Sequence, residues 1–227
     1  MASYVLVPGA GGVAWYWSRV IPLLEATGAQ AVAVDLPGDD PQAGLDDYVD
    51  RVAATAGGRP DVVLVGQSLG AFSASWAATR VPAVGLVLVN GMIPVPGETP
   101  GEWWDATGQP AARRANEERE GRDPDAPFDL DTAFLHDVPP AVAAEGEPYQ
   151  REEADAVFES AWAAAAWPDV PTRVIAGADD RFFPLEFQQR IAADRLGLDV
   201  EVVPGGHLCA LSHPDELAAR LLETAMS

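Results

Sequence analysis

The sequence predicts an α/β fold in which a mostly parallel sheet is covered by helices on both faces. Two observations support this prediction. Short apolar runs of strand length alternate with helix-compatible segments along most of the 227 residues. One of these runs, at residues 62–65, leads into Gly-Gln-Ser-Leu-Gly at residues 66–70 and then into small residues. A strand, a glycine-flanked turn around a serine and a helix form the nucleophile-elbow pattern.

The first half of the chain supplies four of the expected strands and three of the expected helices. Strands are expected at residues 3–7, 31–35, 62–65 and 84–89, where apolar and β-branched residues cluster. Helices are expected at residues 15–27, 45–56 and 70–80. Gly28 and the pair Gly57-Gly58 would end the first two helices, because glycine readily adopts the conformation that closes a helix.

The alternation breaks at about residue 92 and resumes only after residue 167. This segment contains proline- and glycine-rich pieces, a mixed-charge run at 113–122 and one expected helix at 149–166. It also holds six large aromatic residues: Trp103, Trp104, Phe128, Phe134, Trp162 and Trp167. Beyond it, strands are expected at 172–176 and 199–203, and helices at 185–196 and 214–226. We therefore expect one domain over residues 1–227, with residues 92–167 inserted as a helical cap.

The composition excludes several classes of function. The formal net charge is −21, and all 14 basic residues are arginine, so nucleic acid and anionic membranes are not expected partners. No apolar run approaches 18 residues, and the N-terminus lacks the basic segment of a signal peptide. A single cysteine, Cys209, excludes an internal disulfide and a cysteine-based metal cluster. These features predict a cytoplasmic protein with no metal and no cofactor.

The serine of the elbow, Ser68, is the expected nucleophile. A serine on a sharp strand-to-helix turn needs a strained backbone, and its neighbours two residues away must be small. The turn lifts the Ser68 hydroxyl clear of the sheet and places it at a helix N-terminus. Free backbone N–H groups at that position can stabilise a developing oxyanion.

An acid and a histidine follow later strands in the order that this fold requires. Open α/β sheets place their sites at the carboxyl ends of the strands. Asp179 and Asp180 follow the fifth expected strand, and His207 follows the sixth in a Gly-Gly-His turn. His207 would accept the serine proton and return it to the leaving group, while one of the two acids would orient the imidazole. The order of these residues alone leaves the choice between Asp179 and Asp180 open.

The chain resembles the α/β-hydrolase superfamily, and within it the small plant-type methylesterase and hydroxynitrile-lyase branch with its bacterial relatives. The matching segments are residues 7–12 with Trp15, residues 22–24, residues 34–38, the elbow, residues 177–184 and residues 206–207. The resemblance implies an α/β-hydrolase fold and an esterase-like activity. A Gly-x-x-Asp-x-x-x-Pro pattern carries the acid in this family, and Asp180 fits it.

The resemblance also implies an oxyanion hole and a substrate pocket. By position in the family, the oxyanion donors are the backbone N–H groups of Ala10 and Leu69, although Pro8 stands where histidine is usual. Gln67 points away from the serine in the family, so no chemistry is expected of it. Four tryptophans are the expected substrate-binding residues: Trp15, Trp103, Trp104 and Trp162.

These residues predict a carboxylesterase-like serine hydrolase that acts on a small or medium apolar ester through an acyl-enzyme. One alternative is a nucleotide-dependent oxidoreductase, because residues 9–14 match a dinucleotide-binding fingerprint and Asp35 ends the next strand. A second alternative is a hydroxynitrile lyase, although that branch uses a cap lysine and this chain has none. A third is a non-catalytic ligand-binding or biosynthetic accessory protein on the same fold. The oligomeric state stays open.

Overall fold

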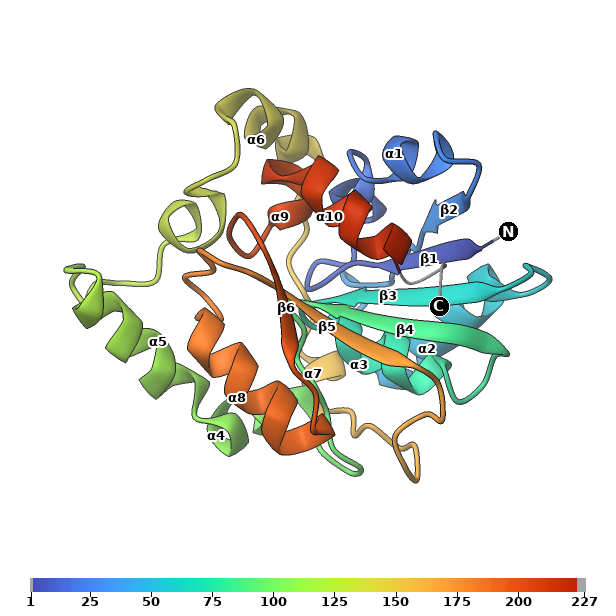
Figure 1. The fold of residues 1–227 in the computed structure, drawn as a ribbon. Coiled ribbons are helices and arrows are strands. Elements are labelled where there is room, and N and C mark those ends of the chain that lie inside the picture. The colour runs from blue at the N-terminus through green and yellow to red at the C-terminus, as the bar shows by residue number, and fades with distance from the viewer. Residues whose placement is uncertain (1, 224–227) are drawn as a thin grey trace.

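A single parallel sheet organises the protein (Figure 1). The computed structural model describes residues 2–223. Within these residues, six strands are arranged in the order β2-β1-β3-β4-β5-β6, and every neighbouring pair is parallel. The strands are β1 (Ser3–Val7), β2 (Gln30–Ala33), β3 (Val62–Gln67), β4 (Ala83–Val89), β5 (Thr172–Gly177) and β6 (Val200–Val203). All six expected strands are present.

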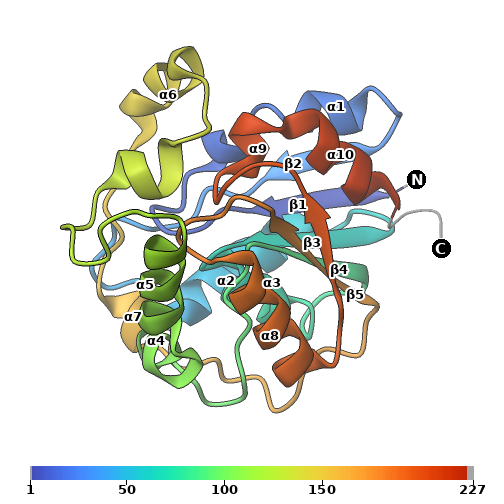
Figure 2. The same ribbon diagram turned by 60° about the vertical axis from the view of Figure 1, so that its left-hand side comes forward.

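Helices follow the strands and cover both faces of the sheet. Those outside the segment between β4 and β5 are η1 (Ala14–Trp17), α1 (Ile21–Glu25), α2 (Leu45–Ala56), α3 (Gly70–Ala77), α8 (Leu185–Leu196), α9 (Cys209–Ser212) and α10 (Pro214–Leu222). Figures 1 and 2 show α1, α9 and α10 on one face of the sheet, and α2, α3 and α8 on the other. Each face has its own buried apolar cluster. The expected α/β-hydrolase architecture, a parallel sheet with helices on both faces, is therefore confirmed.

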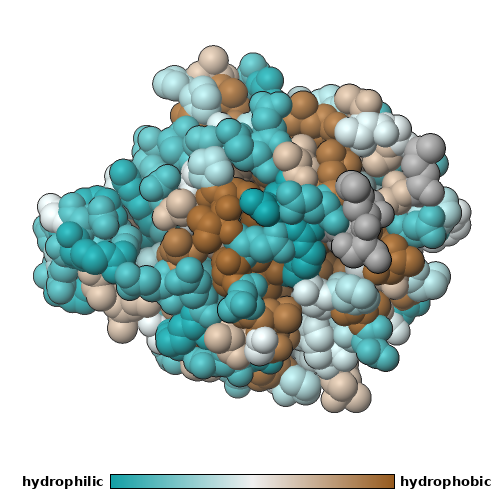
Figure 3. Space-filling view, in the orientation of Figure 1, coloured by the Kyte–Doolittle hydropathy of each residue, from teal (hydrophilic) through white to brown (hydrophobic). Residues whose placement is uncertain are grey.

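The segment between β4 and β5, residues 90–171, interrupts this alternation and is called the insertion below. It contains α4 (Pro100–Thr107), α5 (Gln109–Arg119), η2 (Asp131–Leu135), α6 (Pro140–Gly146), η3 (Glu147–Tyr149) and α7 (Ala156–Glu159). Helices α4 and α5 lie beside α8, whereas α6 lies beside α9 on the other side of the molecule (Figures 1 and 2). Hydrophilic residues cover the outer surface of the arm that carries α5 (Figure 3).

Two expected helices are wrong in detail. The helix expected at 15–27 is divided into η1 and α1, because Pro22 lacks a backbone N–H and disfavours helical residues before it. The helix expected at 149–166 is limited to the single turn of α7. Trp162 instead exchanges backbone hydrogen bonds with residues 97 and 98, of 3.0 and 2.9 Å. These tertiary bonds outweigh the helix propensity of the alanines around Trp162.

The last expected helix corresponds to α10, and residues 224–226 of that prediction lie outside the described part of the chain. None of the helices described between residues 2 and 223 is long and apolar enough to cross a membrane.

Candidate active site

Ser68 lies on the sharp turn between β3 and α3. Its φ angle is +51°, in the left-handed region that costs a non-glycine residue about 1–3 kcal/mol. Backbone hydrogen bonds hold this conformation. The Ser68 N–H donates to the Val89 carbonyl at 3.1 Å, and the Met92 N–H donates to the Ser68 carbonyl at 3.0 Å. The strand ends of β3 and β4 therefore fix the serine in place.

Two glycines allow the close approach that this turn requires. A Cβ atom on Gly70 would lie 2.2 Å from the Pro8 carbonyl oxygen, and one on Gly66 would lie 2.7 Å from the Gly70 carbonyl oxygen. Both contacts involve backbone atoms that cannot move aside. Both glycines thus have a steric cause: Gly70 packs against the end of β1, and Gly66 packs against the start of α3.

Asp180 and His207 form a buried pair at the ends of β5 and β6. His207 Nδ1 lies 2.8 Å from Asp180 Oδ2. The other carboxylate oxygen, Oδ1, accepts hydrogen bonds of 2.8 Å from the backbone N–H groups of Phe182 and Phe183. Asp179, in contrast, is exposed. The geometry pairs His207 with Asp180 and leaves Asp179 outside the site.

Asn90 holds the histidine loop to the strand that carries the acid. This residue is fully buried at the end of β4, with a φ of +46°. Its amide Nδ2 donates to the carbonyls of Gly206 and His207 at 3.2 and 3.0 Å, and its Oδ1 accepts from the Gly177 N–H at 2.8 Å. Asn90 was not among the site residues expected from the sequence. A polar residue that directly follows a buried strand was the signal available for it.

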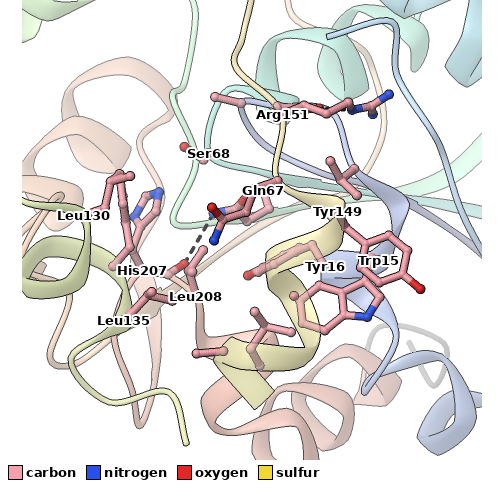
Figure 4. A pocket seen from close by; sticks show the side chains of 18 of the residues that line it. Trp15, Tyr16, Gln67, Ser68, Leu130, Leu135, Tyr149, Arg151, His207 and Leu208 are labelled. Atoms are coloured by element: carbon pink, nitrogen blue, oxygen red, sulfur yellow. Dashed lines mark hydrogen bonds between the residues drawn. The ribbon is translucent and has the colours of Figure 1, made fainter. Parts of the chain in front are cut away.

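Gln67 also contacts the histidine loop. Its Nε2 donates to the His207 carbonyl at 3.3 Å, as the dashed line in Figure 4 shows. The side chain also contributes to the wall of the pocket beside Ser68. No chemistry was expected of Gln67, and its contacts here are with the histidine loop and the pocket wall.

A pocket of about 370 Å³ lies beside Ser68 and His207. Figure 4 shows these two residues on one side of it and Trp15 with Tyr149 on the other. The indole and phenol rings of this second pair stack, with centroids 5.6 Å apart and planes 10° apart. Most of the lining is apolar: Ala10, Gly11, Val13, Trp15, Tyr16, Leu130, Phe134, Leu135, Ala143, Gly146, Tyr149, Leu208 and Leu211. About half of the wall comes from residues 130–153 of the insertion.

Of the four expected substrate-binding tryptophans, the structure brings only Trp15 to this pocket. Trp103 and Trp162 are fully buried in the apolar cluster on the α2–α3–α8 face of the sheet. Their indole N–H groups donate to backbone carbonyls, of Ile93 and Phe72 respectively. Trp104 is half-buried against Phe182 and Phe183. The structure does not place these three tryptophans in the pocket wall, because Trp103 and Trp162 pack in the core and Trp104 packs against the loop after β5.

The two expected oxyanion donors, the backbone N–H groups of Ala10 and Leu69, belong to two loops near Ser68. Ala10 lies in the pocket wall, and Leu69 directly follows Ser68 at the start of α3. Within residues 2–223, neither N–H group donates to a protein acceptor. Both donors are therefore available to an oxygen atom bound next to Ser68.

Burial shifts the pKa values of other ionisable groups around the site. It raises the pKa of the Tyr16 phenol well above its usual value, and it raises the pKa of the Cys209 thiol to about 12. Cys209 is thus a neutral thiol and no rival nucleophile. Burial also raises the pKa of the Glu153 carboxyl. In the described part of the chain, no cluster of three or more His, Cys, Asp or Glu side chains is arranged for a metal ion.

Among the described residues that line the pocket, Arg151 is the only arginine, and its donors are occupied. Its guanidinium donates to the carbonyls of Gly11, Gly12 and Leu36 and forms ion pairs with Asp35 and Asp39. It therefore offers no free positive charge to a bound molecule.

Comparison with known proteins agrees with this architecture. A model of the alpha/beta hydrolase family matches residues 4–220. The chain is 28% identical to a pyrethroid hydrolase of Sphingobium wenxiniae over 99% of this chain and 88% of that protein. It is 37% identical to Methylesterase 3 of Arabidopsis thaliana over 44% of this chain and 43% of that protein.

A solved structure shares the fold. The crystal structure of polyneuridine aldehyde esterase has a TM-score of 0.80 and 23% identity, covering 99% of each chain. This likeness concerns the fold alone. Because the family match spans nearly the whole described chain and the sheet and helices agree with it, the protein belongs to the alpha/beta hydrolase family.

Proposed function

We propose that the protein is a serine-dependent carboxylic ester hydrolase that works through an acyl-enzyme. One observation carries the proposal: a buried Asp180–His207 pair, 2.8 Å apart, borders the pocket into which the strained elbow presents Ser68. The relatives named pyrethroid hydrolase and methylesterase support the same class of reaction.

In the proposed reaction, the Ser68 hydroxyl oxygen attacks the ester carbonyl carbon while His207 Nε2 accepts the hydroxyl proton. The carbonyl oxygen becomes an oxyanion, which the N–H groups of Ala10 and Leu69 would stabilise. Asp180 stabilises the charged imidazole. The tetrahedral intermediate collapses, the C–O bond to the alcohol breaks, and His207 gives its proton to that alcohol. A water molecule then attacks the acyl carbon while His207 accepts its proton. The C–O bond to Ser68 breaks, His207 returns the proton to the serine oxygen, and the carboxylic acid leaves.

The substrate is a neutral, small or medium, apolar ester. The lining of the pocket is mostly apolar, and the stacked Trp15 and Tyr149 rings offer a flat wall opposite Ser68. A carboxylate on the substrate would find no free cation, because Arg151 is already neutralised by Asp35 and Asp39 and bonded to three carbonyls. Desolvating such a charge without a partner would be costly.

We assign the role of cap to part of the insertion. Residues 130–153 contribute about half of the pocket wall, whereas α4 and α5 contribute none of it. Substrate size is therefore set by η2, α6 and η3.

The nucleotide-binding alternative loses support from the packing of the glycine loop. A Cβ atom on Gly11 would lie 2.9 Å from the Arg151 carbonyl oxygen, and the Gly11 N–H donates to Glu153. The insertion thus occupies the space, and takes one of the donors, that a pyrophosphate would need.

Ser68→Ala tests the proposal. The variant should lose turnover of p-nitrophenyl esters of graded acyl length, and a fluorophosphonate should label the wild type but not the variant. Ser73→Ala is the matched control, because Ser73 is also buried but donates only to the Gly70 carbonyl. It should keep both activity and labelling. Full turnover in the Ser68 variant, or labelling at another serine, would refute the nucleophile assignment.

A further inference from the structure

The loop between β1 and η1 carries one of the two oxyanion donors of the proposed function. It contains Gly11 and Gly12, whose φ angles are +83° and +66°. The Gly12 N–H donates to the Gly9 carbonyl at 3.0 Å. In a trans peptide, the N–H points opposite to the carbonyl, so this turn aims the Ala10 N–H away from Gly12. Ala10 itself lies in the pocket wall. The direction of the donor depends on the shape of the glycine turn.

Two charged side chains from the insertion hold this turn. Glu153 Oε2 accepts a hydrogen bond of 2.5 Å from the Gly11 N–H. Arg151 Nε donates to the Gly11 carbonyl at 3.0 Å, and its Nη2 donates to the Gly12 carbonyl at 2.9 Å. Together they fix the peptide groups on both sides of Gly11. We call Arg151 and Glu153 the loop clamp.

The loop clamp is itself anchored in the body of the protein. The second oxygen of Glu153 accepts a hydrogen bond from the hydroxyl of Tyr48, a fully buried residue of α2. Arg151 also donates to the Leu36 carbonyl at 3.2 Å and lies 3.2 Å from Asp35. The two side chains thus connect the glycine turn to α2 and to the segment after β2.

Burying the Glu153 carboxylate has a desolvation cost. Burial raises the pKa of the Glu153 carboxyl, because the charged form loses its hydration at this position. Without the clamp, two glycines in the left-handed region would regain about 1–2 kcal/mol of backbone entropy each. A turn with that freedom would not keep the Ala10 N–H aimed at one point.

We propose that Arg151 and Glu153 are positioning residues that fix the turn carrying the Ala10 N–H donor. The inference rests on the proposed function, since it assigns them a purpose in that reaction. An oxyanion donor acts on charge that develops only in the transition state, so its misplacement lowers kcat more than it changes KM. The insertion therefore contributes to the chemistry as well as to the pocket wall.

Glu153→Ala, Glu153→Gln and Arg151→Lys separate positioning from substrate contact. Removing an oxyanion donor outright costs about 10²–10³ in kcat. Misaiming it in Glu153→Ala should lower kcat by roughly 10- to 100-fold, with KM changed less than about threefold. Glu153→Gln keeps an acceptor for the Gly11 N–H and should recover most of kcat. Arg151→Lys cannot span two carbonyls with a fork of donors, so its kcat should fall as well.

Glu145→Ala is the matched control. Glu145 also joins the insertion to the body of the protein, through an exposed ion pair with Arg19, but it does not contact the glycine turn. Its loss should leave kcat unchanged. A rise in KM at constant kcat in Glu153→Ala, or an equal loss of kcat in the control, would overturn the proposal.

Hydrogen–deuterium exchange decides the positioning claim without any turnover. In wild type, the peptide that covers residues 9–13 should be protected, and Glu153→Ala should make it exchange at least tenfold faster. Unchanged exchange overturns the loop clamp. If wild type hydrolyses no ester but exchange accelerates in the variant, the proposed function fails while the clamp stands.

Discussion

Asp180→Asn should abolish most activity because the structure forces the new amide into the wrong orientation. Asp180 uses Oδ1 for the backbone N–H groups of Phe182 and Phe183 and Oδ2 for His207 Nδ1. An asparagine has a single amide oxygen. If that oxygen faces the two backbone donors, the amide nitrogen faces Nδ1 and donates to it. The imidazole proton must then sit on Nε2, which can no longer accept the proton of Ser68.

The size of the expected loss of kcat follows from the free energy of the opposite amide orientation. Turning the amide to restore the productive tautomer of His207 leaves the N–H groups of Phe182 and Phe183 facing another donor. A buried donor without a partner costs about 1–3 kcal/mol, so the productive state lies roughly 2–6 kcal/mol above the unproductive one. Since 1.36 kcal/mol corresponds to a factor of ten, kcat should fall by about 1.5 to 4.5 orders of magnitude. A comparable exchange in a serine protease triad reaches the upper end of this range.

Steady-state hydrolysis of a chromogenic ester measures this effect, with Asp179→Asn as the control. Asp179 is exposed, so its variant should keep kcat within about twofold. Thermal unfolding should be recorded for both variants to verify that they fold. If Asp180→Asn keeps more than a tenth of the wild-type kcat, or if Asp179→Asn is the more damaging, the hydrogen-bond argument is refuted.

Two further predictions distinguish a residue that anchors the insertion from one that lies in the pocket wall. Trp162→Ala should lower the free energy of unfolding by about 3–5 kcal/mol, measured by denaturant titration, and leave the relative kcat/KM values among esters unchanged, because Trp162 is buried away from the pocket. A shift in ester preference would place it at the site after all. Gly146→Ala should change ester preference instead: a Cβ atom there would lie 2.7 Å from the Trp15 ring. The indole end can turn, so KM for long-chain esters should change more than KM for an acetate, and equal changes would contradict this reasoning.

The elbow and the catalytic order could be predicted because they are local features. Gly66 and Gly70 stand two residues on either side of Ser68, and a strand before them and a helix after them can be recognised in the same short stretch of sequence. His207 and the acids follow apolar runs that end at the same edge of a parallel sheet. The rule that sites lie at the carboxyl ends of parallel strands therefore brings together the serine, the acids and the histidine from three distant segments.

The pocket wall could not be predicted because long-range contacts form it. Nothing near Trp103 or Trp162 in the sequence distinguishes a tryptophan that anchors the insertion from one that lines a site. The same holds for Glu153, whose partners Gly11 and Tyr48 lie more than a hundred residues earlier. The insertion does contain one local signal for a helix start: Thr99 and Glu102 form a capping box at the beginning of α4.

Different parts of the insertion anchor it to the sheet and contribute to the pocket. Its first half packs Trp103 against the sheet, and Trp162 near its end does the same, so the segment is anchored at two points. Between them, residues 130–153 cross to the site, where they provide about half of the pocket wall and include the two side chains of the loop clamp. The apolar residues of this stretch line the pocket, whereas Glu153 and Arg151 bond to the glycine turn. Changes of wall residues can therefore alter substrate preference without disturbing the donors, provided that the clamp is kept.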